Sequence, residues 1–263
     1  MKTTIIKNLA SVMFACYATT IISAPHWTHD EQSTWWAVED TAQTVPLKYP
    51  YAECGVGKHQ SPVDLATATI TNTKPLNRLQ VLYGADTPSF FNSGHGVQVN
   101  TSDNYTGVLK IGEESFPLIQ FHFHEPSEHV VGGRPFPAEL HYVHINDDGR
   151  IIVLGVAIDV GSEHPVFQTI LDNMPHEESA ENSTAGIQLN PAQLLPALDS
   201  ENLDYYTLAG SLTTPPCSEG VQWYLLPQTI TISAAQLEQL RGFYSSNARA
   251  PQEINGRALL STQ

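Results

Sequence analysis

Positive charge is scarce in this chain. The 263 residues include 12 Lys and Arg against 27 Asp and Glu, a formal net charge of −15. Nonspecific binding to nucleic acid or to anionic lipid depends on Lys and Arg that neutralise phosphate groups. No basic patch appears along the sequence, so we expect no nucleic-acid partner.

Long linkers and internal repeats are absent as well. No composition shift and no long Gly-, Ser- or Pro-rich segment divides the sequence, and 41% of the residues are hydrophobic. That fraction, over this length, is adequate for one complete core. We therefore predict a single folded domain over residues 25–263.

The apolar run from Leu9 to Ile22 is too short and too lightly flanked for a stable membrane span. Two lysines precede this run and small residues follow it, which is typical of a secretory signal peptide. We predict a signal in residues 1–24, cleaved after Ala18 or Ala24, with Ala24 preferred because the folded-looking sequence begins directly afterwards. The protein is then exported, to the periplasm or as a secreted protein.

Cysteine is limited to three residues. Cys16 follows Met-Phe-Ala, a poor match to a bacterial lipoprotein acceptor site, so lipidation is not favoured. Once the signal is removed, Cys54 and Cys217 remain, and in an exported chain they are a natural disulfide pair. Such a bridge stabilises by roughly 4–5 kcal/mol in the chain-entropy model.

Histidine, in contrast, is plentiful and arranged in a pattern. His122 and His124 are two residues apart in an alternating stretch, so in a strand they project from the same face. Glu139, His141 and Val143 share one face of a second alternating stretch. The Gly- and Pro-rich connection between the two stretches returns the chain beside the first strand, which brings three imidazoles together.

Three histidine ligands with a fourth position left to water are typical of catalytic zinc, whereas structural zinc is closed by four ligands, mostly Cys. A ligating His usually donates its other N–H to an acceptor that fixes the ring. Gln120 and Glu139 are suited to that role. The sequence therefore predicts a Zn2+ site made by His122, His124 and His141.

Short alternating or apolar segments elsewhere predict a large sheet with few helices. Residues 25–60 show little periodicity and are interpreted as an extended arm. Helices are expected over 163–174, after a possible cap at Ser162, and from the capping box Ser233–Gln236 towards Tyr244. Strands are expected near 79–83, 97–99, 108–111, 118–124, 151–158, 205–208 and 221–226.

With these histidines, several separated motifs in one order closely resemble the α-class carbonic anhydrases, and the match extends over nearly all of 26–257. The motifs are Gln60-Ser61-Pro62, Ser93-Gly94-His95-Gly96, Pro126-Ser127-Glu128-His129, Gly210-Ser-Leu-Thr-Thr-Pro-Pro-Cys217, Trp223 and the closing run 247–257.

The resemblance implies a mainly β (α+β) fold, a single domain around a large, mostly antiparallel twisted central β-sheet with short peripheral helices. It implies the reversible hydration of carbon dioxide to bicarbonate and a proton by zinc-bound hydroxide, with weak ester hydrolysis as a possible side activity. Sulfonamides or anions would be inhibitors. The oligomeric state does not follow from the sequence.

The resemblance also assigns roles. Thr213 matches a gatekeeper whose hydroxyl donates to Glu128, Thr214 lines the same polar side, and His95 matches a proton shuttle. The zinc ligands would be His122, His124 and His141, held by Gln120, by the carbonyl of Asn247 and by Glu139 respectively. The apolar wall that receives the substrate would be Val143, Val153, Leu212 and Trp223.

Two further features follow from the same resemblance. Secreted relatives carry a disulfide at the positions of Cys54 and Cys217, which would anchor the N-terminal arm to the loop after Thr214. His29 stands where the family usually has a Tyr that helps order the water chain to the shuttle. The resemblance therefore implies zinc binding more directly than it implies proton transfer.

Two other functions compete with the enzyme interpretation. A non-catalytic binding protein on the same fold would be indicated by loss of a zinc-ligand His, but all three are present with Thr213 and Glu128. A dedicated zinc esterase should add an oxyanion donor or a substrate groove, and no motif indicates one.

Overall fold

The computed structural model describes residues 24–41, 48–71, 76–184, 186–196, 203–244 and 246–262. The predicted signal peptide, Cys16 included, lies outside these residues except for Ala24 at its end. Within the described part of the chain no helix is long and apolar enough to cross a membrane.

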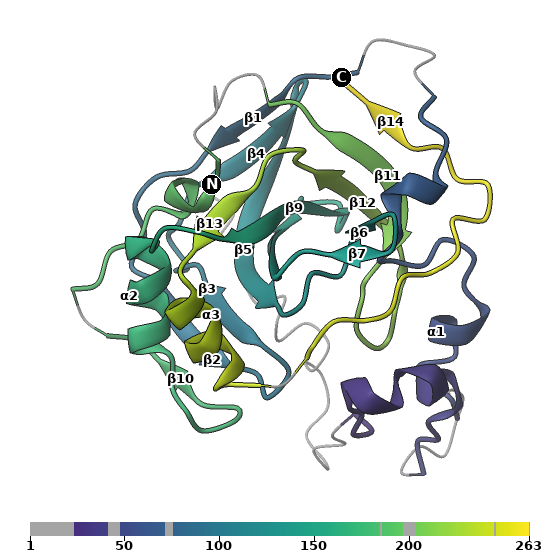
Figure 1. Cartoon of the computed structure of the whole chain (residues 1–263), viewed down its shortest axis with the longest axis horizontal. Helices are drawn as coiled ribbons and strands as arrows, with labels where there is room; N and C mark the ends of the chain where they lie inside the picture. Colours follow the sequence, from purple (N-terminus) through teal and green to yellow (C-terminus); the bar gives the residue numbers. More distant parts are fainter. Residues whose placement is uncertain are drawn as a thin grey trace, which may run out of the picture.

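A large sheet forms the centre of the molecule (Figure 1). Its path runs β10-β2-β3-β5-β8-β9-β12-β11-β14, with β4 beside β5, β1 beside β4, and β13 beside β9. The three long central strands are β5 (Glu114–His124), β8 (Ala138–Ile145) and β9 (Ile151–Val160). The others are β1 (Leu79–Leu82), β2 (Ser89–Asn92), β3 (Val97–Asn100), β4 (Val108–Ile111), β10 (Glu181–Asn182), β11 (Tyr206–Ser211), β12 (Glu219–Leu225), β13 (Ile230–Ile232) and β14 (Leu260–Ser261).

The sheet is mixed. Its pairings are antiparallel except that β9 runs parallel to both β12 and β13, so the expectation of a mostly antiparallel sheet is confirmed with that addition. The continuous apolar run in β9 fits this position, because successive side chains of the strand, which point to opposite faces, are buried from Ile152 to Val156. A small separate hairpin joins β6 (Val130–Val131) to β7 (Arg134–Pro135).

The helices are short and lie at the periphery, as predicted (Figure 1). The capping box at Ser233 and Gln236 is present at the start of α3 (Ala234–Arg241). α2 (Pro165–Asn173) begins later than expected: its N-cap is His164, whose ring accepts from the Phe167 N–H, so Ser162 is not the cap. The remaining helices are α1 (Glu53–Val56) and the 3-10 helices η1 (His29–Ala37), η2 (Leu65–Thr67) and η3 (Pro191–Leu194).

The N-terminal arm is therefore more ordered than its weak periodicity indicated. η1 carries the buried Trp35, whose Nε1 donates to the Thr28 carbonyl at 2.7 Å. The Cys54–Cys217 disulfide joins α1 to the loop after Thr214, as expected. Packing and this bridge organise the arm, which is why the local sequence pattern did not predict the helical segment.

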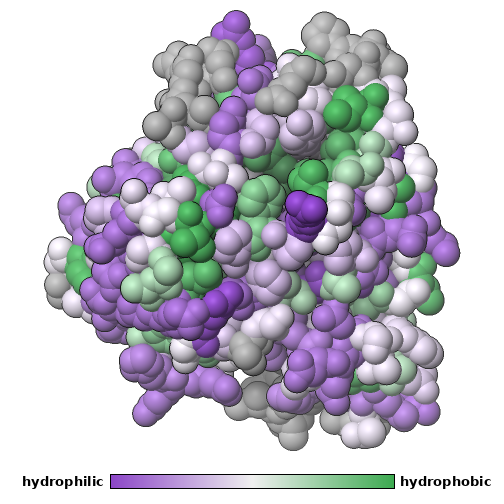
Figure 2. Space-filling model, in the orientation of Figure 1, coloured by the Kyte–Doolittle hydropathy of each residue, from purple (hydrophilic) through white to green (hydrophobic). Residues whose placement is uncertain are grey.

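Opposite faces of β5 have different surroundings. Phe121 and Phe123 point into the larger apolar core, while His122 and His124 lie on the other face. On the outside of the molecule, hydrophilic residues cover most of the face in Figure 2, and apolar residues gather in smaller patches. The sheet thus separates a continuous core from the face that carries the histidines.

Candidate metal centre

Three imidazoles meet on the histidine-bearing face of the sheet. Antiparallel pairing of β5 with β8 sets His122 directly opposite His141, and His124 follows two residues along the same face. One nitrogen from each ring lies within 4.8 Å of the other two. The structure therefore brings the three predicted ligand residues together.

The second nitrogen of each ring is held by a neighbouring acceptor. These contacts are His122 Nδ1 with Gln120 Oε1 at 2.8 Å, His124 Nδ1 with the Asn247 carbonyl at 2.9 Å, and His141 Nε2 with Glu139 Oε1 at 2.9 Å. The nitrogens left over are Nε2 of His122, Nε2 of His124 and Nδ1 of His141. Fixing one nitrogen of a ring sets the direction of the other.

The electrostatics favour neutral rings. Burial lowers the pKa of His122 well below its ordinary value, and the nearby His124 and His141 lower it further. Burial also lowers the pKa of His124, although the Glu128 carboxylate opposes this shift. Neutral imidazole is the form that binds a metal.

The donor set fits zinc. His124 Nε2 is buried and has no hydrogen-bond partner among the described residues, and an unpaired buried nitrogen is costly unless something binds it. Three converging nitrogens without a fourth protein ligand match a catalytic zinc geometry. A second group of three, made by His129, Glu139 and His141, is also close enough for a metal, but its atoms already bond to one another.

Glu139 is the connecting residue beneath the histidines. Its Oε2 accepts from the backbone N–H groups of Glu128 and His129, and its Oε1 accepts from His129 Nδ1 and His141 Nε2. Burial alone would raise the pKa of this carboxyl, but the neighbouring His129 and His141 hold it well below its ordinary value. Glu139 is therefore an ionised acceptor with every contact satisfied.

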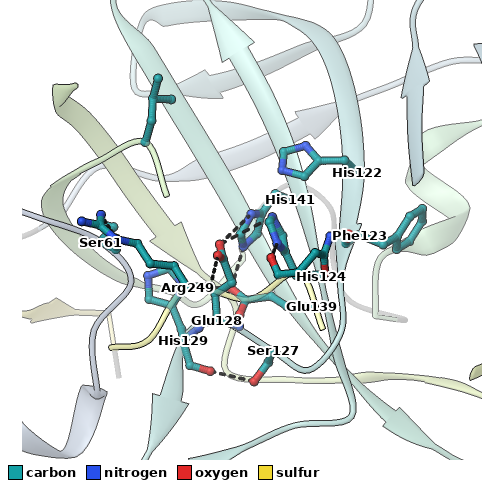
Figure 3. Close-up of polar contacts among 12 residues, drawn as sticks. Ser61, His122, Phe123, His124, Ser127, Glu128, His129, Glu139, His141 and Arg249 are labelled. Atoms are coloured by element: carbon teal, nitrogen blue, oxygen red, sulfur yellow. Dashed lines mark hydrogen bonds and ion pairs between the residues drawn. The ribbon is translucent and has the colours of Figure 1, made fainter. Parts of the chain in front are cut away.

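The Glu128 carboxylate faces His124 and His141 (Figure 3). Its Oε1 accepts from the Arg249 N–H at 2.9 Å. Its Oε2 lies 3.5 Å from His124 Nε2 and 3.9 Å from His141 Nδ1, and has no hydrogen-bond partner among the described residues. The expected hydrogen bond from the Thr213 hydroxyl is thus not formed at this oxygen.

A cavity of about 280 Å3 opens over the three histidines. One side is polar and includes Thr213 and Thr214. The apolar part of the lining includes Val143, Val153, Leu212 and Trp223, which are the four residues expected to receive the substrate. Such a mixture suits a small apolar molecule that must approach a polar centre.

His95 lies at the edge of this cavity, where its ring stacks on Trp27 with centroids 3.9 Å apart. Asn247 Nδ2 donates to the His95 carbonyl at 2.8 Å, so the residue that holds His124 also anchors this loop. Burial and the neighbouring His26 lower the pKa of His95, while Glu178 opposes the shift. Burial lowers the pKa of His29, whose ring is 5.9 Å from that of His95, to about 4.

The sequence did not indicate three residues of this site. Gln98 lines the cavity because it pairs with His122 across β3 and β5, and the alternation Val-Gln-Val was a usable signal for it. Trp27 belongs to the N-terminal arm and also lines the cavity. The arm has no hydrophobic periodicity from which its position could be predicted. His129 was part of a motif, but only the structure shows that it shares Glu139 with His141.

Comparison with known proteins gives a consistent picture. A model of the eukaryotic-type carbonic anhydrase family matches residues 40–263. A carbonic anhydrase of Pectobacterium atrosepticum is 35% identical over 255 residues, covering 96% of this chain and 98% of that protein.

Two solved structures are similar in fold, each with a TM-score of 0.74 and 34% identity. The alignment with the α-carbonic anhydrase of Photobacterium profundum covers 87% of this chain and 95% of that protein. The α-carbonic anhydrase of Thermovibrio ammonificans was solved in complex with the inhibitor sulfanilamide. Its alignment covers 90% of this chain and 100% of that protein.

Proposed function

Because this chain belongs to the eukaryotic-type carbonic anhydrase family, we propose that it hydrates carbon dioxide reversibly at a zinc ion held by His122, His124 and His141. The observation that carries this proposal is the convergence of three imidazole nitrogens whose partner nitrogens are all held by other groups. The reaction itself is that of a carbonic anhydrase, which the family and its relatives support.

Zinc in such a site lowers the pKa of bound water to about 7 and so supplies a hydroxide nucleophile near neutral pH. The chain's own residues prepare the surroundings. Burial keeps the rings of His122 and His124 neutral, and Gln120, Glu139 and the Asn247 carbonyl orient the three rings. Glu128, buried and unpaired at Oε2, provides an acceptor close to the ligating nitrogens.

The substrate is small and apolar, so it needs a dry wall beside the polar centre. Val143, Val153, Leu212 and Trp223 supply that wall in our proposal. Thr213 and Thr214 on the polar side would orient the nucleophilic oxygen, with Thr213 in the gatekeeper role. Bicarbonate leaves into water because the wall offers it no hydrogen bonds.

Each turnover also releases a proton. His95, at the edge of the cavity and stacked on Trp27, would accept this proton and pass it to buffer. An imidazole is suited to this because its pKa lies near neutral pH. His29 beside it stays neutral under these conditions, since its pKa is about 4.

Several further expectations belong to the same proposal. Sulfonamides should bind this chain, because a relative at 34% identity was solved with sulfanilamide, and small anions should inhibit. Weak ester hydrolysis is a side activity of the same nucleophile. The Cys54–Cys217 bridge supports export to an oxidising compartment, the periplasm or the exterior.

A non-catalytic binding role is less well supported. A non-catalytic binding protein does not require three histidines that converge and are each oriented by a hydrogen-bond partner. In this chain all three histidines have that arrangement, and the Glu139 carboxylate that holds His141 is ionised. The geometry therefore favours the enzyme over the binding protein.

The test is stopped-flow carbon dioxide hydration together with zinc analysis of the same sample. We expect one zinc per chain and fast hydration that sulfanilamide abolishes. His141→Ala should lose zinc and activity together, whereas His176→Ala, at an exposed position outside the cavity, should keep both. A His141→Ala protein that hydrates carbon dioxide without zinc would refute the proposal.

A further inference from the structure

A second cavity lies next to the metal centre and is not used in the reaction described above. Its volume is about 180 Å3, and it shares no lining residue with the cavity over the histidines. Glu139 lines this second cavity, while its hydrogen-bond partner His141 lines the first. The two cavities are therefore separated by one pair of residues.

Both cavities lie on the same face of the sheet. Glu139 and His141 are two residues apart on β8, and their partners on β9 are Ala157 and Gly155. Gly155 and Leu225 both line the second cavity. A side chain at position 155 would clash with Leu225, because a Cβ there would lie 2.6 Å from Leu225 Cδ2. The second cavity is thus one step along the strands from the metal centre.

The walls are mainly apolar and come from separate elements. They include Leu65 of η2, Val131 of β6, Phe136, Leu225 and Pro227. Val131 is 50% exposed, which is unusual for a valine and marks the rim of the cavity. In Figure 1 the β6–β7 hairpin projects in front of the sheet, where it forms part of this rim.

Hydrogen bonds at the protein surface connect two elements of the rim. The Asp64 carboxylate accepts from Ala66 N–H at 3.0 Å in η2, and from Gly132 N–H at 2.8 Å and Gly133 N–H at 2.6 Å in the hairpin turn. One side chain therefore ties together the two elements that border the opening.

His129, which lines the cavity, has one ring nitrogen without a partner among the described residues. Glu139 Oε1 accepts from His129 Nδ1, so the proton of a neutral His129 ring is on Nδ1 and its Nε2 is an acceptor. That Nε2 is buried and has no partner among the residues the structure describes, and the side chain is only 5% exposed. A group with one O–H or N–H would satisfy it.

We propose that this second cavity binds a small ring-shaped molecule that is apolar except for one hydroxyl or N–H group, as in benzyl alcohol. Size supports this class, because a cavity of about 150 Å3 lined by apolar side chains is enough to bind benzene. The donor of the ligand pairs with His129 Nε2, and its ring replaces water against Leu225 and Phe136.

An occupant of this cavity is in contact with the support of the metal centre. His129 packs against Trp223, with ring centroids 4.6 Å apart, and shares Glu139 Oε1 with His141. The ligand therefore acts on the metal site only through these residues, while the substrate cavity stays open.

Saturation-transfer NMR on the zinc-loaded protein tests this site with benzyl alcohol as the probe. Binding should persist when sulfanilamide is present in excess, because that inhibitor is expected in the first cavity. Benzyl methyl ether, which lacks the donor, should bind several-fold more weakly. Competition by sulfanilamide, or equal affinity for the ether, would overturn the assignment.

Two pairs of variants locate the probe. Ala157→Leu fills the cavity and should weaken binding by about tenfold or more, whereas Ala209→Leu, at an exposed strand position outside it, should not. Val131→Asp at the rim should also weaken binding, and Leu82→Asp, equally exposed on β1, should leave it unchanged.

Unchanged binding to both Ala157→Leu and Val131→Asp, or no transfer to the unmodified protein, would refute the proposal. Neither readout requires catalysis, so this result is independent of the hydration assay. If the protein hydrates carbon dioxide but does not bind benzyl alcohol, the proposal of a second binding site is refuted and the proposed function stands.

Discussion

At the scale of single residues, the candidate metal centre depends on how each histidine ring is held. In each ring one nitrogen is fixed by a hydrogen-bond partner, which orients the other nitrogen. His124 is held by a carbonyl that is 123 residues away in the sequence, at Asn247. The same Asn247 donates to the His95 carbonyl. One residue near the C-terminus therefore positions a proposed ligand and the loop of the proposed shuttle together.

His95→Ala should slow hydration by about 10²-fold in weak buffer, because the neighbouring His29, whose pKa is lowered to about 4, is a poor proton acceptor near neutral pH. Strong imidazole buffer should restore most of the rate, since small buffer molecules can carry the proton instead. Stopped-flow rates at low and high buffer concentration measure this.

The matched control is His59→Ala, at an exposed histidine outside the cavity. Its rate should not depend on buffer more than that of the unmodified protein. If His95→Ala loses the same fraction of rate in strong and weak buffer, His95 acts on cavity structure and not on proton transfer.

Some residue positions were predictable and others were not. His122, His124 and His141 followed from alternation within two strands, because a strand places every second side chain on one face. The contact of His129 with Glu139 joins β8 to a non-repeating turn. No local pattern encodes such a contact, so only the folded chain could reveal it.

At the scale of elements, α3 shows how local chemistry defines a helix start. The Ser233 side chain accepts from the Gln236 backbone N–H, and the Gln236 side-chain oxygen accepts from the Ser233 backbone N–H. α2 differs, because Pro165 and the His164 ring begin it and the neighbouring Ser162 does not. Proline fits a first helical turn, where its missing N–H costs nothing.

Ser233→Ala should therefore lower the free energy of unfolding by about 1 kcal/mol, with the fold unchanged. Ser162→Ala serves as the control and should be neutral, because the cap of α2 is His164. Urea unfolding followed by circular dichroism measures both. Equal losses in the two variants would contradict the assignment of the caps.

At the scale of the whole molecule, one covalent link connects the N-terminal arm to the site. Cys54 and Cys217 are 163 residues apart in sequence, and Cys217 follows the loop that carries Thr213 and Thr214. Gln60 Nε2 donates to the Cys217 carbonyl at 3.0 Å, which adds a second tie between the arm and that loop.

Replacing both cysteines by Ala should lower the free energy of unfolding by about 5 kcal/mol in the chain-entropy model. Activity should fall as well, because the polar side of the cavity loses its anchor. Chemical denaturation and hydration rates, compared with dithiothreitol-treated protein, test this. A double variant with full stability would show that hydrogen bonds alone hold the arm.

Acid should destabilise the molecule through its buried histidines. Burial lowers the pKa of His144 to about 3, against 6.5 in an unfolded chain. Between these values the unfolded state binds a proton that the folded state does not, so stability falls as pH decreases from 6.5 to 3. One such group changes stability by at most about 1.4 kcal/mol per pH unit.

The check is urea unfolding at several pH values between 7 and 4. His144→Gln, which keeps a hydrogen-bonding side chain near Tyr83, should show a shallower dependence than the unmodified protein. His176→Ala, at an exposed position, should show no such difference. Identical pH slopes for His144→Gln and the unmodified protein would exclude His144 as the source.

The sequence by itself indicated the central sheet, the convergence of His122, His124 and His141, the capping box of α3 and the cysteine pair. Each depends on spacing, composition or elimination that is visible along the chain. The length of the apolar run in β9 likewise indicated a covered central strand. Each was visible as a residue pattern in the sequence, although the disulfide and the strand pairings themselves join distant segments.

Only the tertiary structure decided the rest. η1 in the arm, the sharing of Glu139 by His129 and His141, the unpaired oxygen of Glu128 and the second cavity all depend on which distant segments meet. Register between β5 and β8 places His122 opposite His141, and packing of η2 against the β6–β7 hairpin encloses the second cavity. Contacts between residues far apart in sequence set these features, because no single segment carries both partners.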